Sequence, residues 1–128
     1  MSEKLAGKCV VVIEDNDVIR DLFVLLLKRH EARIHPCRSG KEALDILRNT
    51  TADIVLCDII LPDLEGVEIL QTLRSWPNNA NAKVIALTAV ANTGDRDRFL
   101  KQGFDGYMPK PINPATFVDD ILAIVNQS

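Results

Sequence analysis

Short, continuous apolar runs alternate along the chain with longer segments in which apolar residues recur at helical spacing. The runs at residues 9–13, 54–57 and 84–87 have no polar break and contain β-branched side chains. Such runs are typical of strands that are covered on both faces, as in a parallel sheet. Residues 32–36 and 105–108 are weaker or shorter candidates, so the pattern predicts five strands.

Helices are predicted between these strands from apolar spacing and end signals. Residues 18–30 carry apolar side chains at the spacing of one helical face. Ser39 and Glu42 match a capping box and predict the start of a second helix. A third helix is expected to follow Gly66 and to end before Pro77.

Two more helices are predicted in the last third of the chain. Residues 95–102 form a less apolar segment for which Gly103 is a stop signal. Asn113 is the expected N-cap of the last helix and Pro114 its first residue. Five alternations of strand and helix, without an internal repeat or linker, predict one α/β domain over residues 1–128. Helices should cover both faces of its parallel sheet.

Polar residues follow four of the five predicted strands. Glu14 and Asp15 close the first strand, Asp58 the third, Thr88 the fourth and Lys110 the fifth. Because the carboxyl ends of parallel strands meet at one edge of a sheet, these side chains should share one crevice. The second strand has no such residue, as expected for a strand at the edge of the sheet.

Crowded carboxylates of this kind predict a cation site. Two carboxylates about 5 Å apart repel by about 3 kcal/mol at an effective dielectric constant of about 20. Oxygen ligands without histidine or cysteine favour Mg²⁺. A carboxylate beside Mg²⁺ can accept a phosphoryl group as an aspartyl phosphate, and a lysine and a hydroxyl could neutralise and bind the transferred group.

Composition narrows the possible functions. The net charge of −3 over 128 residues gives no support for binding nucleic acid or a membrane through bulk electrostatics. The first residues lack the apolar core of a signal peptide, and no run approaches the length of a membrane span. Cys9, Cys37 and Cys57 match no metal-binding spacing. Cys9 and Cys57 lie in apolar runs and are expected to pack in the core, which favours a reducing, cytoplasmic setting.

Four motifs together resemble the receiver domain of response regulators in two-component signalling, over essentially the whole chain. The matching residues are Glu14-Asp15, Asp58 with the loop at residues 61–66, Thr88-Ala89 and Lys110-Pro111. The resemblance implies a flavodoxin-like fold, with five parallel strands in the order 2-1-3-4-5. Because the sequence ends after the fifth predicted helix, we expect a stand-alone receiver without an output domain.

The resemblance also implies a role for each of these residues. Asp58 would accept the phosphoryl group. Asp15, Asp58 and the Ile60 carbonyl would bind Mg²⁺, and Glu14 would act through water. The phosphoryl contacts and switch positions would be Thr88, Ala89, Tyr107, Lys110 and Pro111, with a cis bond between the last two. Ile60 and Val90 lie where some family members carry polar groups that orient an attacking water, so their apolar side chains predict slow dephosphorylation.

The expected function is phosphorylation by a histidine kinase or a histidine phosphotransfer protein, followed by phosphorylation-dependent binding of a protein target. The fourth helix, fifth strand and fifth helix would form the target surface, and no turnover of a free substrate is expected. An aspartyl-phosphate hydrolase would need an acid where Ile60 stands. A flavodoxin-like cofactor binder would need a phosphate loop in place of the acidic residues 14–17. A receiver that only docks on a partner would normally have lost an acid or the lysine, and none is missing.

Several residues also have simpler interpretations. Tyr107 is also compatible with ordinary half-buried packing. Asp63 and Glu65 are expected to be solvated loop acids, too far along the loop to join the acidic cluster.

Overall fold

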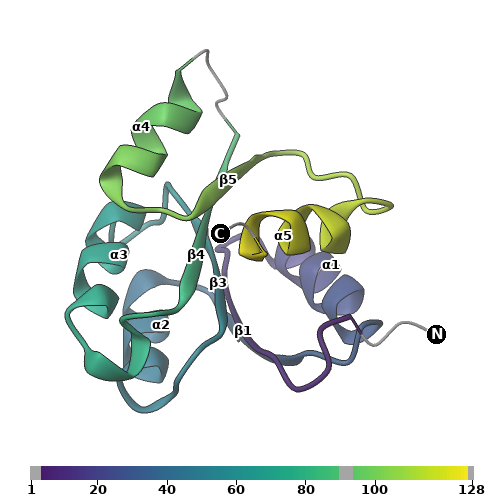
Figure 1. Ribbon diagram of the computed structural model, residues 1–128, viewed down its shortest axis with the longest axis horizontal. Helices are drawn as coiled ribbons and strands as arrows, with labels where there is room; N and C mark the ends of the chain where they lie inside the picture. The colour runs from purple at the N-terminus through teal and green to yellow at the C-terminus, as the bar shows by residue number, and fades with distance from the viewer. Residues whose placement is uncertain (1–3, 90–93, 127–128) are drawn as a thin grey trace.

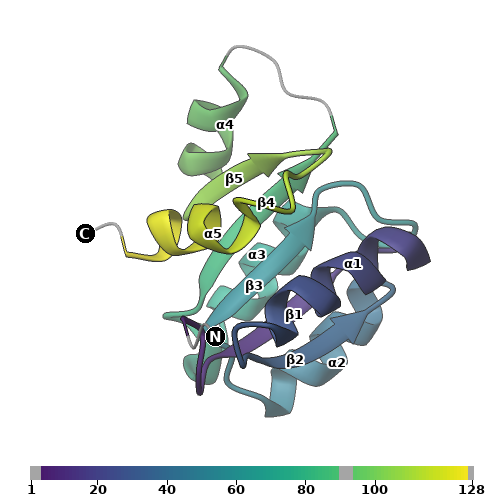
Figure 2. The same cartoon turned by 90° about the vertical axis from the view of Figure 1, so that its right-hand side faces the viewer.

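The apolar runs form the central strands of a parallel sheet in the computed structural model, which describes residues 4–89 and 94–126 (Figure 1; Figure 2). The strands are β1 (Cys9–Ile13), β2 (Arg33–Cys37), β3 (Ile54–Asp58), β4 (Lys83–Thr88) and β5 (Gly106–Pro109). The helices are α1 (Asp17–Lys28), α2 (Gly40–Asn49), α3 (Gly66–Arg74), α4 (Asp95–Gln102) and α5 (Phe117–Val125), with a 3₁₀ turn η1 (Pro77–Asn79). The strand order is β2-β1-β3-β4-β5, so the expected topology is confirmed.

Alternate residues of each strand face opposite layers of helices. Val10 and Val12 point into one core with α1 and α5, whereas Val11 and Ile13 point into a second core beneath α2, α3 and α4. Figure 1 shows these two layers on either side of the sheet. Because both faces are covered, the central strands can be apolar without a break.

Local signals set most of the helix ends as predicted. The Ser39 side chain accepts a hydrogen bond from the Glu42 N–H at 3.2 Å and caps α2. Gly103 ends α4 with φ of 110°, a left-handed conformation that glycine adopts without steric cost. In α1, Asn16 is the N-cap, and the helix runs slightly earlier in the chain than residues 18–30.

The predicted start of the last helix is wrong. Asn113 does not cap α5, whose N-cap is Thr116 and whose first residue is Phe117. The Asn113 side chain instead accepts from the Ala115 N–H at 3.0 Å, and its carbonyl accepts from the Thr116 N–H at 3.1 Å. An asparagine can make the same short-range bonds in a turn as at a helix start, so the Asn-Pro signal marks a turn here.

The sheet brings the carboxyl ends of β1, β3, β4 and β5 to one edge of the molecule (Figure 2). β2 ends at the same edge but is an outer strand of the sheet, as expected. Phe23 of α1 stacks on Phe117 of α5 with ring centroids 5.0 Å apart, which ties together the two helices that cover one face of the sheet. No helix within residues 4–89 and 94–126 has the length and hydropathy needed to span a bilayer.

Candidate functional site

The predicted carboxylates meet where β1 and β3 end. The two strands are paired as far as Ile13 and Cys57, so the next residues, Glu14 and Asp58, emerge side by side. Oxygen atoms of Glu14, Asp15 and Asp58 all lie within 4.8 Å of one another. Glu14 and Asp58 are buried, and Asp15 is exposed at the mouth of the cluster.

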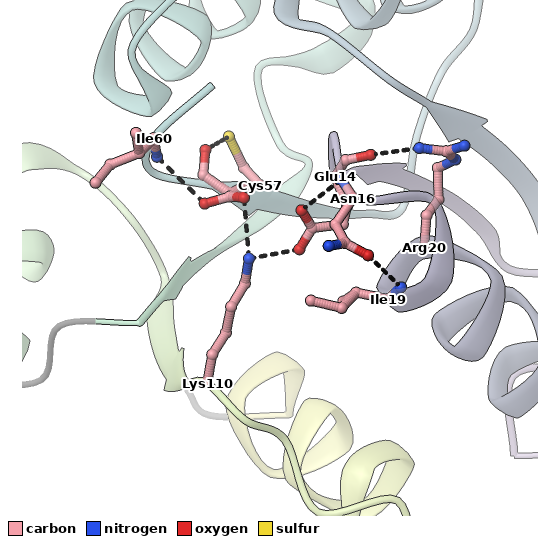
Figure 3. Close-up of polar contacts among 8 residues, drawn as sticks. Glu14, Asn16, Ile19, Arg20, Cys57, Ile60 and Lys110 are labelled. Carbon is pink, nitrogen blue, oxygen red and sulfur yellow. Dashed lines mark hydrogen bonds and ion pairs between the residues drawn. The ribbon is translucent and has the colours of Figure 1, made fainter. Parts of the chain in front are cut away.

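Lys110 joins this cluster from the end of β5. Its Nζ lies 2.5 Å from Glu14 Oε1 and 2.9 Å from Asp58 Oδ2, so one ammonium group binds two carboxylates (Figure 3). Burial alone would lower the pKa of Lys110, but its hydrogen bonds to Glu14 and Asp58 outweigh that effect and raise the pKa above its ordinary value. Lys110 is therefore charged at neutral pH and offsets much of the repulsion within the cluster.

Asp58 is the candidate nucleophile at the end of β3, and the neighbouring Cys57 does not compete with it. The second carboxylate oxygen of Asp58 accepts from the Ile60 N–H at 3.2 Å. Burial, with a smaller contribution from the Asp58 charge, raises the pKa of the Cys57 thiol far above neutrality. Cys57 therefore remains a neutral thiol and does not compete as a nucleophile.

An open hollow of about 560 Å³ lies over the cluster. Its lining includes Asp15, Asp58, Ala89, Lys110 and Pro111, which lie at the carboxyl ends of four different strands. The bond between Lys110 and Pro111 is cis, as the resemblance implied. The hollow gives a small charged group access to both the acidic cluster and the lysine.

Of the predicted switch residues, Ala89, Lys110 and Pro111 line this hollow, whereas Tyr107 lines a separate hollow between β5 and α5. Thr88 ends β4, is 6% exposed, and its carbonyl accepts from the Lys110 N–H at 2.7 Å. Tyr107 is half-buried, and its ring packs against Phe99 of α4 with centroids 5.8 Å apart. Tyr107 therefore already takes part in packing in this conformation. Val90 lies outside the described residues.

Asp63 is exposed and lies outside the acidic cluster, as expected, but it also has a structural role that the sequence did not predict. Its carboxylate accepts from the backbone N–H groups of Gly40 and Lys41, both at 2.9 Å, and so caps α2 from a distant loop. Burial alone would raise the pKa of Asp63, but these backbone hydrogen bonds outweigh it and lower the pKa. Glu65 is exposed and makes no capping hydrogen bond.

Arg20 is a residue of the site that the sequence reasoning missed. Its side chain is 9% exposed, and its Nη1 donates to the Glu14 carbonyl at 2.8 Å. The signal was present in the helical spacing, because Arg20 falls on the same face of α1 as the buried Phe23 and Leu27. A charged residue on a buried face requires partners, and here these are the Glu14 carbonyl and Asp17.

The chemistry of the donor set suits a hard divalent cation. The cluster offers three carboxylates and no histidine or thiolate, the ligand type that Mg²⁺ prefers. Glu14, Asp15 and Asp58 are the residues that could hold such an ion.

The sequence is similar to those of known proteins. Residues 10–122 match the family model of the response regulator receiver domain. The polar-differentiation response regulator DivK of Brucella ovis is 36% identical over 114 residues, which cover 89% of this chain and 93% of that protein. DivK of Brucella anthropi is 35% identical over the same shares of both chains.

Solved structures give the same fold. The chemotaxis response regulator CheY4 of Vibrio cholerae superposes with a TM-score of 0.85 at 21% identity, over 94% of this chain and 99% of that one. The receiver domain of the sensor histidine kinase PA1611 from Pseudomonas aeruginosa, solved with a magnesium ion in its active site cleft, has a TM-score of 0.83 at 28% identity, over 95% and 100% of the two chains. The fold, the grouped strand ends and the family match agree, and the chain belongs to the response regulator receiver domain family of two-component signalling.

Proposed function

We propose that this receiver accepts a phosphoryl group on Asp58 from a histidine kinase or a histidine phosphotransfer protein, with Mg²⁺ as cofactor. The phosphorylated form then signals by binding a protein target. Like other receivers, it is a signalling protein and not an enzyme that turns over a free substrate. Three buried free thiols support a reducing compartment such as the cytoplasm.

The observation that carries the proposal is the position of Lys110. Its Nζ bridges Asp58 and Glu14 at the floor of the open hollow. A cation placed directly on the candidate nucleophile is also placed to bind the phosphoryl oxygens once that nucleophile has reacted. The lysine could then exchange a carboxylate partner for a phosphoryl partner without leaving its position.

The reaction is a transfer between two protein side chains. An oxygen of Asp58 attacks the phosphorus of the phosphohistidine and forms a P–O bond as the P–N bond breaks. The electron pair of that bond returns to the imidazole nitrogen of the donor. Lys110 and the Thr88 hydroxyl would bind the oxygens of the transferred group, and Ala89 leaves room beside them.

The metal would be held by Asp15, Asp58 and the Ile60 carbonyl, with Glu14 acting through water. When bound, Mg²⁺ supplies positive charge that neutralises the phosphoryl oxygens during transfer. The exposed Asp15 makes no hydrogen bond or ion pair within the part of the chain that the structure describes, so its carboxylate is open to a ligand.

The output surface is proposed to lie on α4, β5 and α5. A hydrogen bond from Thr88 to the phosphoryl group would draw in the end of β4. The neighbouring strand β5 carries Tyr107, which packs against Phe99 of α4. A hollow of about 380 Å³ between β5 and α5, lined in part by Tyr107, Ile112 and Ile124, offers a place for an apolar side chain of the target. A switch of this kind needs only a few kcal/mol of differential stabilisation, which charge-assisted hydrogen bonds can supply.

The phosphoacceptor is tested by incubating the protein with acetyl phosphate and Mg²⁺ and measuring its intact mass. One phosphoryl group should be added, and hydroxylamine should remove it. Asp58→Asn should abolish the addition and keep the fold, as judged by circular dichroism. Labelling that persists in Asp58→Asn would place the acceptor elsewhere.

The output is tested by pulling down targets with and without beryllofluoride, a mimic of the phosphoryl group. Thr88→Ala should still accept a phosphoryl group but lose the phosphorylation-dependent capture of targets. Tyr107→Ala should change target binding and leave the rate of labelling nearly unchanged. Unaltered capture in both variants would place the output surface on another face.

A further inference from the structure

Arg20 is a buried cation at the first turn of α1 that the proposed phosphoryl transfer does not use. Its guanidinium donates to the Glu14 carbonyl at 2.8 Å and is paired with Asp17. It approaches Glu14 from the side away from Lys110 (Figure 3). A buried arginine that donates to a backbone carbonyl holds that carbonyl, and the peptide group it belongs to, in one orientation.

Glu14 is consequently restrained along both its backbone and its side chain. Its N–H donates to the Cys37 carbonyl at 3.1 Å, and its carbonyl accepts from Arg20. Its carboxylate accepts from Lys110 at 2.5 Å and from the Asn16 N–H at 3.2 Å. The peptide group that links Glu14 to Asp15 therefore has a defined orientation.

Asp15 depends on that orientation more than its neighbours do. The carboxylates of Glu14 and Asp58 are each held by hydrogen bonds of their own. The carboxylate of Asp15 has no such contact among the described residues, so its direction follows from its backbone. The peptide group that joins Glu14 to Asp15 contains the Glu14 carbonyl, which Arg20 binds.

We propose that Arg20 is a positioning residue for the metal site, which acts by holding the Glu14 carbonyl and thereby directing Asp15 toward Asp58. This inference rests on the proposed function, in which Asp15 and Asp58 bind Mg²⁺. Residues that orient metal ligands without touching the metal typically contribute about 10- to 100-fold to its affinity. Arg20 is suited to this role because one nitrogen can bind the carbonyl while another binds Asp17.

Electrostatics alone predicts the opposite effect for the loss of this arginine. Arg20 carries a positive charge close to the cluster, and its removal should strengthen the binding of a divalent cation if charge is all that matters. Positioning predicts weaker binding instead. The sign of the change in Mg²⁺ affinity therefore separates the two explanations.

The experiment is a calorimetric titration of the full chain with Mg²⁺ alone. Arg20→Met, which keeps the apolar stem, should raise the Kd of Mg²⁺ by about tenfold or more. Arg20→Lys keeps the charge and can offer one donor to the carbonyl, so its Kd should lie between those of the wild type and Arg20→Met. Unchanged or tighter binding in Arg20→Met would overturn the inference.

A control separates positioning from a general loss of stability. Asn79 is fully buried, accepts from the Ala52 N–H, and donates to the Leu47 and Thr50 carbonyls at the opposite end of the sheet. Asn79→Ala should destabilise the fold and leave the Kd of Mg²⁺ unchanged. If Asn79→Ala weakens Mg²⁺ binding as much as Arg20→Met does, the effect is one of stability and the inference fails.

Amide chemical shifts provide a readout without metal. In metal-free protein, Arg20→Met should shift the amide signals of Asp15 and Asn16 strongly, while those of Ile60 stay near their wild-type positions. Shifts of equal size at all three would argue against a local effect on the Asp15 peptide group. This readout also covers the case in which Arg20→Met is too unstable for titration, because the Asp15 and Asn16 shifts can be read in Arg20→Lys.

The proposed function is tested separately by the wild type and by Asp15→Asn. If wild-type protein does not bind Mg²⁺, or if Asp15→Asn binds it equally well, the proposed metal site itself is wrong. If both behave as expected and Arg20→Met binds normally, only the positioning role is refuted.

Discussion

Replacing Lys110 with methionine would remove the one cation that bridges the two buried carboxylates of the site. The side chains of Glu14 and Asp58 are 1% and 10% exposed, so neither can regain full hydration. Breaking a buried ion pair costs about 3–5 kcal/mol, and the lower end applies because Lys110 and Asp58 lie near the surface. The repulsion between carboxylates no more than 4.8 Å apart gives a similar value, at least about 3 kcal/mol at an effective dielectric constant of about 20.

Urea unfolding in EDTA at pH 7, followed by circular dichroism, measures this cost. We expect Lys110→Met to lower the free energy of unfolding by about 3 kcal/mol. Added Mg²⁺ should restore more stability to the variant than to the wild type, because the metal then supplies the missing charge to the same carboxylates. Lys8→Met is the control, since Lys8 is exposed at the other end of β1 and should change stability by less than about 0.5 kcal/mol. A cost of under about 0.5 kcal/mol for Lys110→Met would refute the bridging role.

Three further predictions concern the loops and the packing around the site. Asp63→Ala should cost about 1 kcal/mol at pH 7 by removing the two hydrogen bonds from Gly40 and Lys41 at the start of α2, while the Ser39 cap remains. Because the folded-state pKa of Asp63 is lowered, the difference in stability between the wild type and this variant should persist above pH ~4 and vanish as the pH falls further. A difference that stays constant down to pH ~2.5 in unfolding titrations would contradict this. Ile60→Asn should change the free energy of unfolding by less than about 0.5 kcal/mol, because Ile60 is 74% exposed. The same variant should lose its phosphoryl group faster in a mass-spectrometric time course, and an equal or slower loss would show that Ile60 does not protect that group. Gly106→Ala should cost about 1–3 kcal/mol in urea unfolding, because its Cβ would lie 2.7 Å from Ile124 Cγ2, and a neutral effect would mean that α5 moves freely on β5.

The site depends on contacts that join distant parts of the chain. Asp63 binds backbone groups 22 and 23 residues away, and Lys110 binds carboxylates 52 and 96 residues away. Periodicity and capping rules describe neighbours within a few residues, so they cannot assign such partners. The capping role of Asp63 was missed for this reason, although its exposure and its place in the loop after β3 were predicted correctly.

The helix starts show where local rules succeed and where they fail. Ser39 caps α2 as predicted, because its partner Glu42 lies only three residues away. Asn113 was predicted to cap α5, but an asparagine makes the same short bonds in an isolated turn. The start of α5 at Phe117 coincides with the burial of that ring against Phe23 of α1, a contact between elements far apart in the sequence.

The sequence by itself determined the strands, their parallel arrangement and the grouping of Glu14, Asp58 and Lys110 at one edge. These follow from apolar runs and from polar residues at the strand ends, which are local properties of the chain. Only the tertiary structure decided that Lys110 bridges two carboxylates, that Asp63 caps α2 and that Arg20 binds the Glu14 carbonyl. The direction of a side chain within a crevice is set by the packing of several elements at once, and no single segment carries that information.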